Sequence, residues 1–136
     1  MGIIIKEIKA EETYKIRHEV MWADKSIDFV KLDEDTDGVH FGLFDDDKLI
    51  SIVSLFFKND EVQFRKFATL NDYQGKGYGS MLLNYVFQYG ENQGVKKIWC
   101  HARSKKKDFY QKLGMTPMGD SFLKNEQSYL VMEKNL

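Results

Sequence analysis

The chain has 136 residues, of which 43% are hydrophobic and 14% aromatic, which is enough for one globular domain and too few for two. Its 20 Lys and Arg residues nearly balance its 21 Asp and Glu residues, so the formal net charge is −1. Proteins that bind nucleic acids usually carry a basic excess, and this balance argues against that class. The single proline and the single cysteine, Cys100, exclude a proline-rich linker and a disulfide scaffold.

The sequence gives no sign of export or of membrane insertion. The longest apolar run, Leu49 to Phe57, is about half as long as the ~20 residues that a membrane helix needs. The N-terminal residues have neither the basic region nor the cleavage site of a signal peptide. We therefore expect a cytoplasmic protein with a single domain, residues 1–136, and neither nucleic acid nor membrane as a partner.

The first half of the chain combines a helix with several short strands. The β-branched segment 3–8 predicts a strand, and apolar residues at helical spacing predict a helix within 11–23. The acidic stretch 24–38 has no clear period and is expected to be a loop or an irregular helix. Tight turns then join three strands of an antiparallel meander: 39–44, 49–57 and 61–70.

A glycine-rich loop at 71–79 opens the second half and leads into a helix with apolar residues at i, i+3, i+4 and i+7. The further elements expected are the end of that helix near Gly94, a strand at 95–102, a helix at 104–113 with Ser104 as its candidate cap, and a hairpin of 115–122 with 127–133. This order of elements predicts a mixed α/β fold around one sheet.

The loop before the second helix carries the most chemical information. Glycines at 75, 77 and 79 let backbone N–H groups approach a ligand closely, because they have no Cβ. The N–H groups of the following first helical turn and the helix dipole would attract an anion such as a pyrophosphate. The Walker pattern does not fit here, and neither does the dinucleotide fingerprint, because the glycine spacing differs and a meander precedes the loop.

Gln74-Gly75-Lys76-Gly77-Tyr78-Gly79 fits the pattern Gln-x-x-Gly-x-Gly. It resembles the acyl-CoA pyrophosphate loop of the GNAT family of N-acetyltransferases. Further segments resemble the same family in the right order: 16–20 its first helix in a small subgroup, 65–69 its fourth strand, 98–103 its fifth strand, and 109–115 its Phe-Tyr-x-x-Leu-Gly-Phe segment. The resemblance thus covers most of the chain.

The resemblance implies a mixed, mostly antiparallel sheet of six or seven strands, with helices on both faces and strands four and five splayed apart. It also implies transfer of an acetyl group from acetyl-CoA to a primary amine by direct attack in a ternary complex. Neither a metal nor a covalent enzyme intermediate is required, so Cys100 need not be a nucleophile.

The family's site residues carry over onto matching positions. Backbone groups at Phe67, Ala68 and Thr69 would pair with the pantetheine arm and polarise the thioester carbonyl. The pyrophosphate would be held by the residues of the loop: Gln74, Gly75, Lys76, Gly77, Tyr78, Gly79 and Ser80. Tyr110 matches the family tyrosine that protonates the leaving CoA thiolate.

Two positions near Tyr110 depart from the family's usual residues. Arg103 stands where many members have asparagine, although the subgroup also carries arginine, and Lys106 stands where alanine is usual. Lys106 belongs to a basic run for which two readings stay open, a solvated face or contact with the ribose 3′-phosphate of CoA.

The attacking amine must lose a proton, to a base or to a water relay. His40 and His101 are candidates because imidazole titrates near neutral pH, and Glu61 is a third. The sequence does not choose among them.

The acceptor is the least determined part of the expected reaction. Residues 28–47 carry a local net charge of −7, and residues 96–112 carry +6. We expect the basic segment to attract CoA and the acidic segment to favour a small cationic amine. A lysine or N-terminus of a protein is an alternative acceptor, and a non-catalytic acyl-CoA-binding regulator is an alternative function. Edge strands at the terminal hairpin leave a homodimer open.

Overall fold

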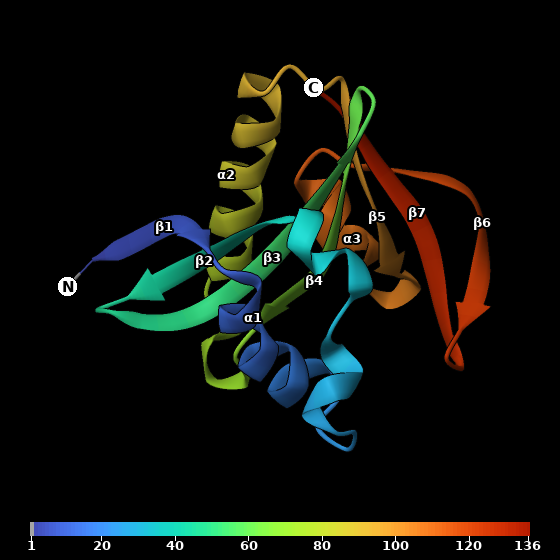
Figure 1. The fold of residues 1–136 in the computed structure, drawn as a ribbon. Helices are drawn as coiled ribbons and strands as arrows, with labels where there is room; N and C mark the ends of the chain where they lie inside the picture. Colours follow the sequence, from blue (N-terminus) through green and yellow to red (C-terminus); the bar gives the residue numbers. More distant parts are fainter. Residues whose placement is uncertain (1) are drawn as a thin grey trace. The chain divides into compact units, whose positions relative to one another are not determined.

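A computed structural model describes residues 2–136 (Figure 1). The chain divides into two compact units, and each is described separately. The first comprises Met1–Phe56 with Phe64–Val86, and the second comprises Phe57–Gln63 with Phe87–Leu136. The prediction of a single domain stays a prediction.

The elements up to the meander are β1 (Ile3–Ile8), α1 (Ala10–Ile16), the π-helical turn η1 (Arg17–Met21), the 3-10 helices η2 (Ile27–Val30) and η3 (Asp33–Asp37), β2 (Val39–Asp45), β3 (Lys48–Lys58) and β4 (Glu61–Thr69). After the meander come the 3-10 helix η4 (Asn71–Tyr73), α2 (Tyr78–Asn92), β5 (Lys97–Arg103), the 3-10 helix η5 (Ser104–Lys106), α3 (Lys107–Lys112), β6 (Thr116–Lys124) and β7 (Gln127–Asn135).

The strands form a mixed sheet in the order β1-β2-β3-β4-β5-β7-β6, which confirms the predicted fold class. The pairs β1–β2, β2–β3, β5–β7 and β6–β7 are antiparallel, whereas β4 and β5 are parallel. The parallel register joins Glu61–Gln63 to Lys97–Trp99, within the second unit. The register of β4 and β5 thus joins the first three residues of each strand. This is the pattern expected for two strands that splay apart after their first residues.

Helical segments cover both faces of the sheet within the first unit. On one face, Ile16 of α1 packs with Ile52 of β3 and Ala68 of β4, and Val20 and Met21 of η1 lie against the same cluster. On the other face, Tyr85 of α2 meets the ring of Phe41 of β2 edge-on, with centroids 5.4 Å apart. Alternation along β2 and β3 explains this arrangement, because successive side chains point to opposite faces.

In the second unit, β5 and β7 pair along their length, from Lys97 opposite Asn135 to Arg103 opposite Tyr129. Lys97 also reaches Glu61 and Glu133, with Nζ–O distances of 3.8 and 3.4 Å. These pairings fix the register of β5 against both of its neighbours.

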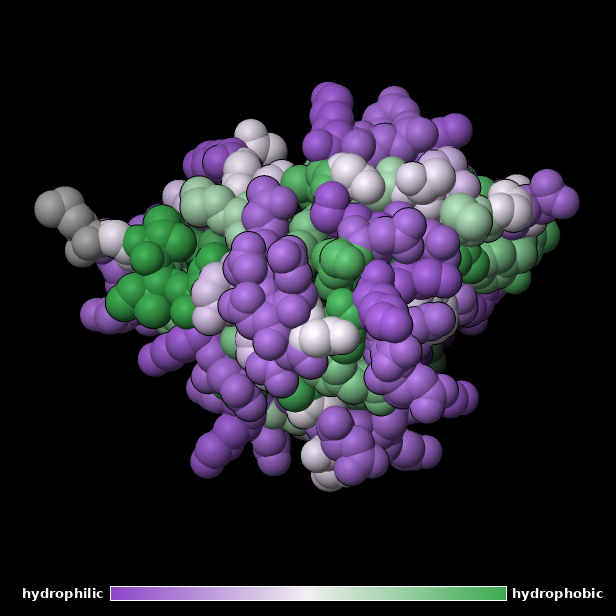
Figure 2. Space-filling view, turned by 90° about the horizontal axis from the view of Figure 1, so that it is seen from above, coloured by the Kyte–Doolittle hydropathy of each residue, from purple (hydrophilic) through white to green (hydrophobic). Residues whose placement is uncertain are grey.

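β1 and β6 are the outer strands of the sheet order. Ile4 on β1 is 55% exposed and Leu123 on β6 is 79% exposed. Figure 2 shows one face that is mostly hydrophilic, with hydrophobic groups gathered beside the N-terminal end. Exposed apolar groups on outer strands are compatible with pairing to a second copy of the chain, and the homodimer stays a prediction.

Two expectations about helices were wrong in detail. The helix predicted over 11–23 is α-helical only to Ile16 and continues as a π-helical turn from Arg17. The guanidinium of Arg17 is buried and hydrogen-bonded to distant segments, an interaction that local periodicity does not reveal. Ser104 does not cap α3, whose N-cap is Lys106, because the Ser104 hydroxyl lies 2.7 Å from that of Ser128.

Candidate functional site

The loop before α2 has the conformation that its glycines predict. Gly75 and Gly77 have φ angles of +76° and +89°, a region that residues with a Cβ rarely adopt. Met81 donates its N–H to the carbonyl of Gly77 at 3.1 Å and so closes the first turn of the 15-residue helix α2. The N–H groups just before Met81 belong to that first turn, which has no partners within the helix. They are therefore oriented to receive an anion at the positive end of the helix dipole.

Gln74 fixes the shape of this loop. Its side-chain Nε2 donates to the backbone carbonyl of Thr69 at 2.8 Å and to Oδ1 of Asn71 at 3.2 Å. The amide thus ties the loop to the end of β4 and to η4. This geometry explains the glutamine at the start of the motif, because its side chain supports the loop. The predicted contact of Gln74 with the cofactor stays a prediction.

Aromatic side chains support the other side of the loop. The hydroxyl of Tyr78 donates to Oδ2 of Asp45 at 3.1 Å, and this hydrogen bond raises the pKa of the Tyr78 phenol above its usual value. The Tyr73 ring lies beside that of Tyr78, and the ammonium groups of Lys48 and Lys76 lie 5.2 and 5.9 Å from its centroid. Two cations therefore gather at Tyr73, next to the expected anion site.

Gly79 brings α2 close to the C-terminal end of β4. A Cβ at Gly79 would lie 2.9 Å from Cζ of Phe67 and 3.6 Å from Oγ1 of Thr69. Ser51 holds the same end of β4, since its Oγ donates to the carbonyl of Ala68 at 3.1 Å and lies 2.8 Å from Oγ1 of Thr69. The structure thus brings together, within one unit, the predicted pantetheine strand and the predicted pyrophosphate loop.

Tyr110 is buried in the second unit, where it is 9% exposed and lies edge-on to Phe109. Burial raises the pKa of its phenol, the nearby Cys100 adds to the rise, and Arg103 opposes it. The phenol is protonated at neutral pH, and the raised pKa makes it a weaker acid than a free tyrosine. Burial likewise raises the pKa of the Cys100 thiol, so the thiolate that a cysteine nucleophile needs is disfavoured.

The remaining predicted residues of the second unit are more accessible. His101 is exposed on β5, with ring centroids of Trp99 and Phe122 at 5.3 and 5.1 Å. Arg103 is half-buried at the end of β5, and Lys106 is exposed at the end of η5. Glu61 forms its ion pair with Lys97. None of these positions by itself identifies a base.

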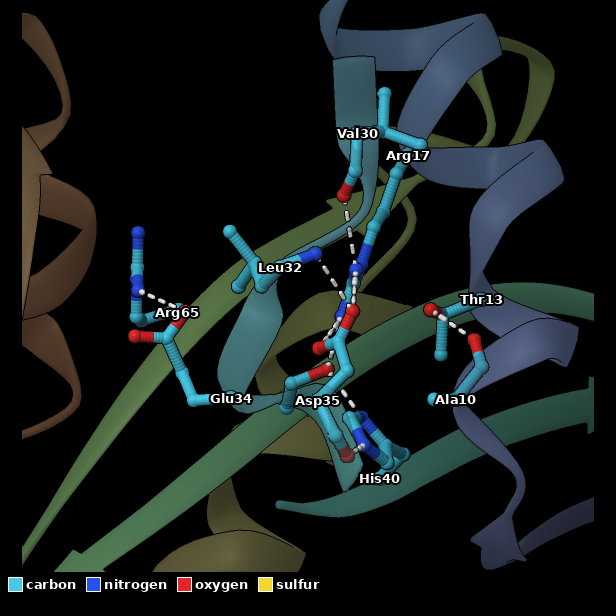
Figure 3. Close-up of polar contacts among 10 residues, drawn as sticks. Ala10, Thr13, Arg17, Val30, Leu32, Glu34, Asp35, His40 and Arg65 are labelled. Carbon is cyan, nitrogen blue, oxygen red and sulfur yellow. Dashed lines mark hydrogen bonds and ion pairs between the residues drawn. The ribbon is translucent and has the colours of Figure 1, made fainter. Parts of the chain in front are cut away.

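His40 is buried, and both of its ring nitrogens have partners. Nδ1 lies 2.7 Å from Oγ of Ser54, and Nε2 lies 2.9 Å from the backbone carbonyl of Asp35. Figure 3 shows that the ring points into a cluster built around Arg17 and Asp35. The structure therefore places the two candidate histidines in different settings, His40 inside a polar cluster and His101 at the surface.

Sequence reasoning missed the centre of this cluster. Arg17 is completely buried, and its guanidinium donates to both carboxylate oxygens of Asp35 at 2.8 and 2.9 Å. Burial would raise the pKa of Asp35, but the hydrogen bonds from Arg17 and from the N–H of Leu32 outweigh it, and the pKa is lowered. The only local signal was a charged residue on the apolar face of the first helix, and a partner 18 residues away leaves no periodic trace.

Within residues 2–136, no three or more His, Cys, Asp or Glu residues are grouped so that they could hold a metal ion. In the same part of the chain, no helix combines the length and apolar character needed to cross a membrane.

Residues 4–115 match the model of the acetyltransferase (GNAT) family. The chain belongs to that family. The uncharacterized N-acetyltransferase YitI of Bacillus subtilis (strain 168) is 34% identical over an alignment of 142 positions, which covers 97% of this chain and 95% of YitI. Membership confirms the resemblance on which the loop was first assigned.

Solved structures show the same fold. A Lactobacillus plantarum protein provisionally described as an N-acetyltransferase has a TM-score of 0.89 at 20% identity, covering 100% of this chain and 99% of its own. The PaiA N-acetyltransferase of Thermoplasma acidophilum, solved in complex with coenzyme A, has a TM-score of 0.77 at 17% identity and full coverage of both chains. At these identities the likeness extends to the fold, while family membership supports acetyltransferase activity and acyl-CoA use.

Proposed function

We propose that this GNAT acetyltransferase transfers an acetyl group from acetyl-CoA to a primary amine of a small molecule. The observation that carries the proposal is the loop from Gly75 to Ser80, which presents glycine backbone and the first turn of α2 beside β4. A Cβ at Gly79 would fill the close approach between helix and strand, so the residues present fit a backbone cradle for the cofactor.

The loop would bind the pyrophosphate through backbone N–H groups and through the dipole of α2. The ammonium group of Lys76 lies at the loop and can add a charge-assisted contact. The end of β4, from Phe67 to Thr69, would present backbone groups to the pantetheine arm, as a strand does when it accepts a peptide-like partner. One N–H of this strand would polarise the thioester carbonyl.

Tyr110 would act as the general acid. In the proposed reaction the amine nitrogen bonds to the carbonyl carbon, the carbon–sulfur bond breaks, and the electron pair goes to sulfur. Tyr110 gives its proton to that sulfur, since its phenol carries a proton at neutral pH. The same proposal includes contacts of Arg103 and Lys106 with the cofactor.

His101 would receive the proton of the attacking amine, directly or through water. Its exposure on β5 and the engagement of both His40 nitrogens support this choice. Glu61 is already paired with Lys97.

The charge of the first unit supports a cationic acceptor. Asp33 and Asp37 of η3 are exposed and can attract an amine that carries further positive charge, whereas Asp28 and Glu34 already pair with Lys31 and Arg65. Phe29 is 48% exposed in the same segment and can cover an apolar part of the acceptor.

A thiol-release assay with acetyl-CoA tests this proposal. The acceptor panel contains polyamines, amino sugars, neutral primary amines and lysine-containing or free-N-terminal peptides. We expect the release of the CoA thiol to require an added amine and to be fastest with small cationic amines. Preference for peptides would instead identify a protein acetyltransferase. Acetyl-CoA binding without thiol release by any amine would identify an acyl-CoA-binding regulator.

A further inference from the structure

We infer that Arg17, Asp35, His40 and Ser54 form a positioning cluster that holds residues 27–37 on the acceptor side, and that His40 is a positioning residue within it. Figure 3 shows Arg17 of η1, Asp35 of η3 and His40 of β2, whose side chains converge, and Ser54 of β3 completes the cluster. The inference rests on the proposed function, because it needs β4 to bind the acyl donor.

The segment 27–37 lies next to that strand. Glu34 of η3 places its Oε1 3.7 Å from Nη1 of Arg65 on β4, two residues before Phe67 (Figure 3). An element beside the acyl-binding strand and rich in exposed carboxylates is where a cationic amine would approach the thioester.

Arg17 ties this segment down at both of its 3-10 helices. Nη1 donates to the carbonyl of Val30 at 3.0 Å, at the end of η2, and to Oδ2 of Asp35 at 2.8 Å, in η3. Nη2 donates to Oδ1 of Asp35 and to Oγ of Ser54 on β3, each at 2.9 Å. One guanidinium therefore links two surface segments to the sheet through planar, bidentate geometry that lysine cannot reproduce.

The hydrogen-bond directions place a hydrogen on Nε2 of His40. A guanidinium can only donate, so Ser54 accepts from Arg17 and its hydroxyl hydrogen is available for Nδ1 of His40. The backbone carbonyl of Asp35 can only accept, so Nε2 of His40 carries the hydrogen. In the neutral ring, Nδ1 then accepts from the Ser54 hydroxyl, so the lone pair that a general base would use is engaged.

The cluster closes into a ring of donors and acceptors. Arg17 donates to Ser54, Ser54 to His40, His40 to the backbone of Asp35, and the carboxylate of Asp35 accepts from Arg17. All four side chains are at most 4% exposed. Nε of Arg17 is buried without a hydrogen-bond partner, while the other polar side-chain atoms of the cluster are paired. A buried network of this kind rigidifies the segments it joins, and its loss leaves further buried polar groups unpaired. The π-helical turn begins at Arg17, and such turns are frequent at functional sites.

The test compares His40→Gln with Ser54→Ala and with the control His18→Gln. Glutamine retains an N–H donor that can reach the Asp35 carbonyl and cannot titrate near neutral pH. His18 lies in η1 outside the cluster, and its Nε2 bonds to the carbonyl of Lys25 at 2.6 Å.

For His40→Gln we expect kcat within about threefold of the parent enzyme and an unchanged acidic limb of the pH–kcat profile. The KM for the amine should rise about tenfold, equivalent to the loss of one hydrogen bond in a network, and the KM for acetyl-CoA should not change. Ser54→Ala should likewise raise the KM for the amine and leave the KM for acetyl-CoA unchanged. His18→Gln should change neither KM. A fall in kcat of about 100-fold or more with loss of the acidic limb would make His40 a base and overturn the inference.

Hydrogen exchange of 27–37 supplies a readout that does not require activity. Backbone amides of this segment should exchange faster in Ser54→Ala and His40→Gln than in His18→Gln, while amides of α2 stay unchanged. Unchanged exchange at 27–37 would overturn the inference. Absence of thiol release by the parent enzyme would instead overturn the proposed function, and the two failures are thereby distinguished.

Discussion

Gly79 at the start of α2 lies so close to Phe67 of β4 that a Cβ would sit 2.9 Å from the tip of the phenylalanine ring. This approach joins the loop expected to hold the pyrophosphate to the strand expected to bind the pantetheine arm. Because both segments belong to the same unit, their relationship is fixed by packing and by the hydrogen bonds of Gln74 and Ser51.

Gly77→Val should abolish acetyl-CoA binding. The φ of +89° at Gly77 is strained for any β-branched residue, by about 1–3 kcal/mol, and the loop would reorganise to relieve that strain. Calorimetric titration with acetyl-CoA should show affinity reduced by more than about 30-fold. Gly94→Val is the matched control, since Gly94 has a φ of +84° and equally open surroundings beyond the end of α2. It should lose similar stability and keep its affinity. Equal affinity in both variants would remove the loop from the binding site.

Tyr110→Phe should lower kcat by about 100-fold or more, because a general acid contributes about 10²–10⁴ in rate. The Kd for acetyl-CoA should stay nearly unchanged, since the phenyl ring keeps its packing against Phe109. The control is Tyr129→Phe, in which a tyrosine of equal exposure, 9%, loses its hydroxyl. Stopped-flow thiol release measures both variants. If Tyr110→Phe turns over at the parent rate, another group protonates the sulfur.

His101→Gln should lower kcat at pH 7 and remove the acidic limb of the pH–rate profile, as expected for loss of a base that titrates near neutral pH. His18→Gln serves again as the surface control, measured with the same amine over pH 5.5–9. Turnover within about threefold of the parent, with the limb retained, would assign the proton transfer to water.

The Arg17–Asp35 pair should make stability depend on acidic pH. Because the folded state lowers the pKa of Asp35 below its ordinary value of 3.8, the contribution is complete above that value and is lost as pH falls through the folded pKa. Urea unfolding between pH 7 and pH 2.5 should show this loss in the parent protein.

Two variants separate the pair from other carboxyl groups. Asp35→Asn should cost about 3–5 kcal/mol at pH 7, because it leaves the buried Arg17 without its counter-charge. The double variant Arg17→Met with Asp35→Leu removes both charges and should regain most of that stability and show a weaker acid dependence. An acid profile identical to the parent's in the double variant would show that other groups carry the dependence.

The sequence was sufficient for the parts of the molecule that follow local rules. The glycine spacing from 75 to 79 predicts the loop, and it does so because positive φ and close backbone approach both depend on residue type. Alternating apolar and polar residues predict the strands of the meander, and the short polar segments between them predict its tight turns. The family resemblance supplied the splayed strands four and five, and the structure adds that β4 and β5 pair in parallel, which no local signal contains.

The sequence was not sufficient where one side chain meets a distant partner. Arg17 bonds to Asp35, 18 residues away, and to Ser54, 37 residues away, so its burial and the π-helical turn could not be inferred from spacing. Ser104 has the residue type of a helix cap, yet its hydroxyl meets Ser128, 24 residues further along the chain. His40 was a candidate base by chemistry alone, and only the contacts of both ring nitrogens show how it is held.

The most direct test of the central claim is a nitrogen–proton correlation spectrum recorded during titration with acetyl-CoA. The backbone amides of Gly75, Gly77 and Gly79 should shift in proportion to occupancy, and inorganic pyrophosphate alone should move the same amides in the same direction. Binding of acetyl-CoA without a shift in the resonances of these three amides would contradict the account.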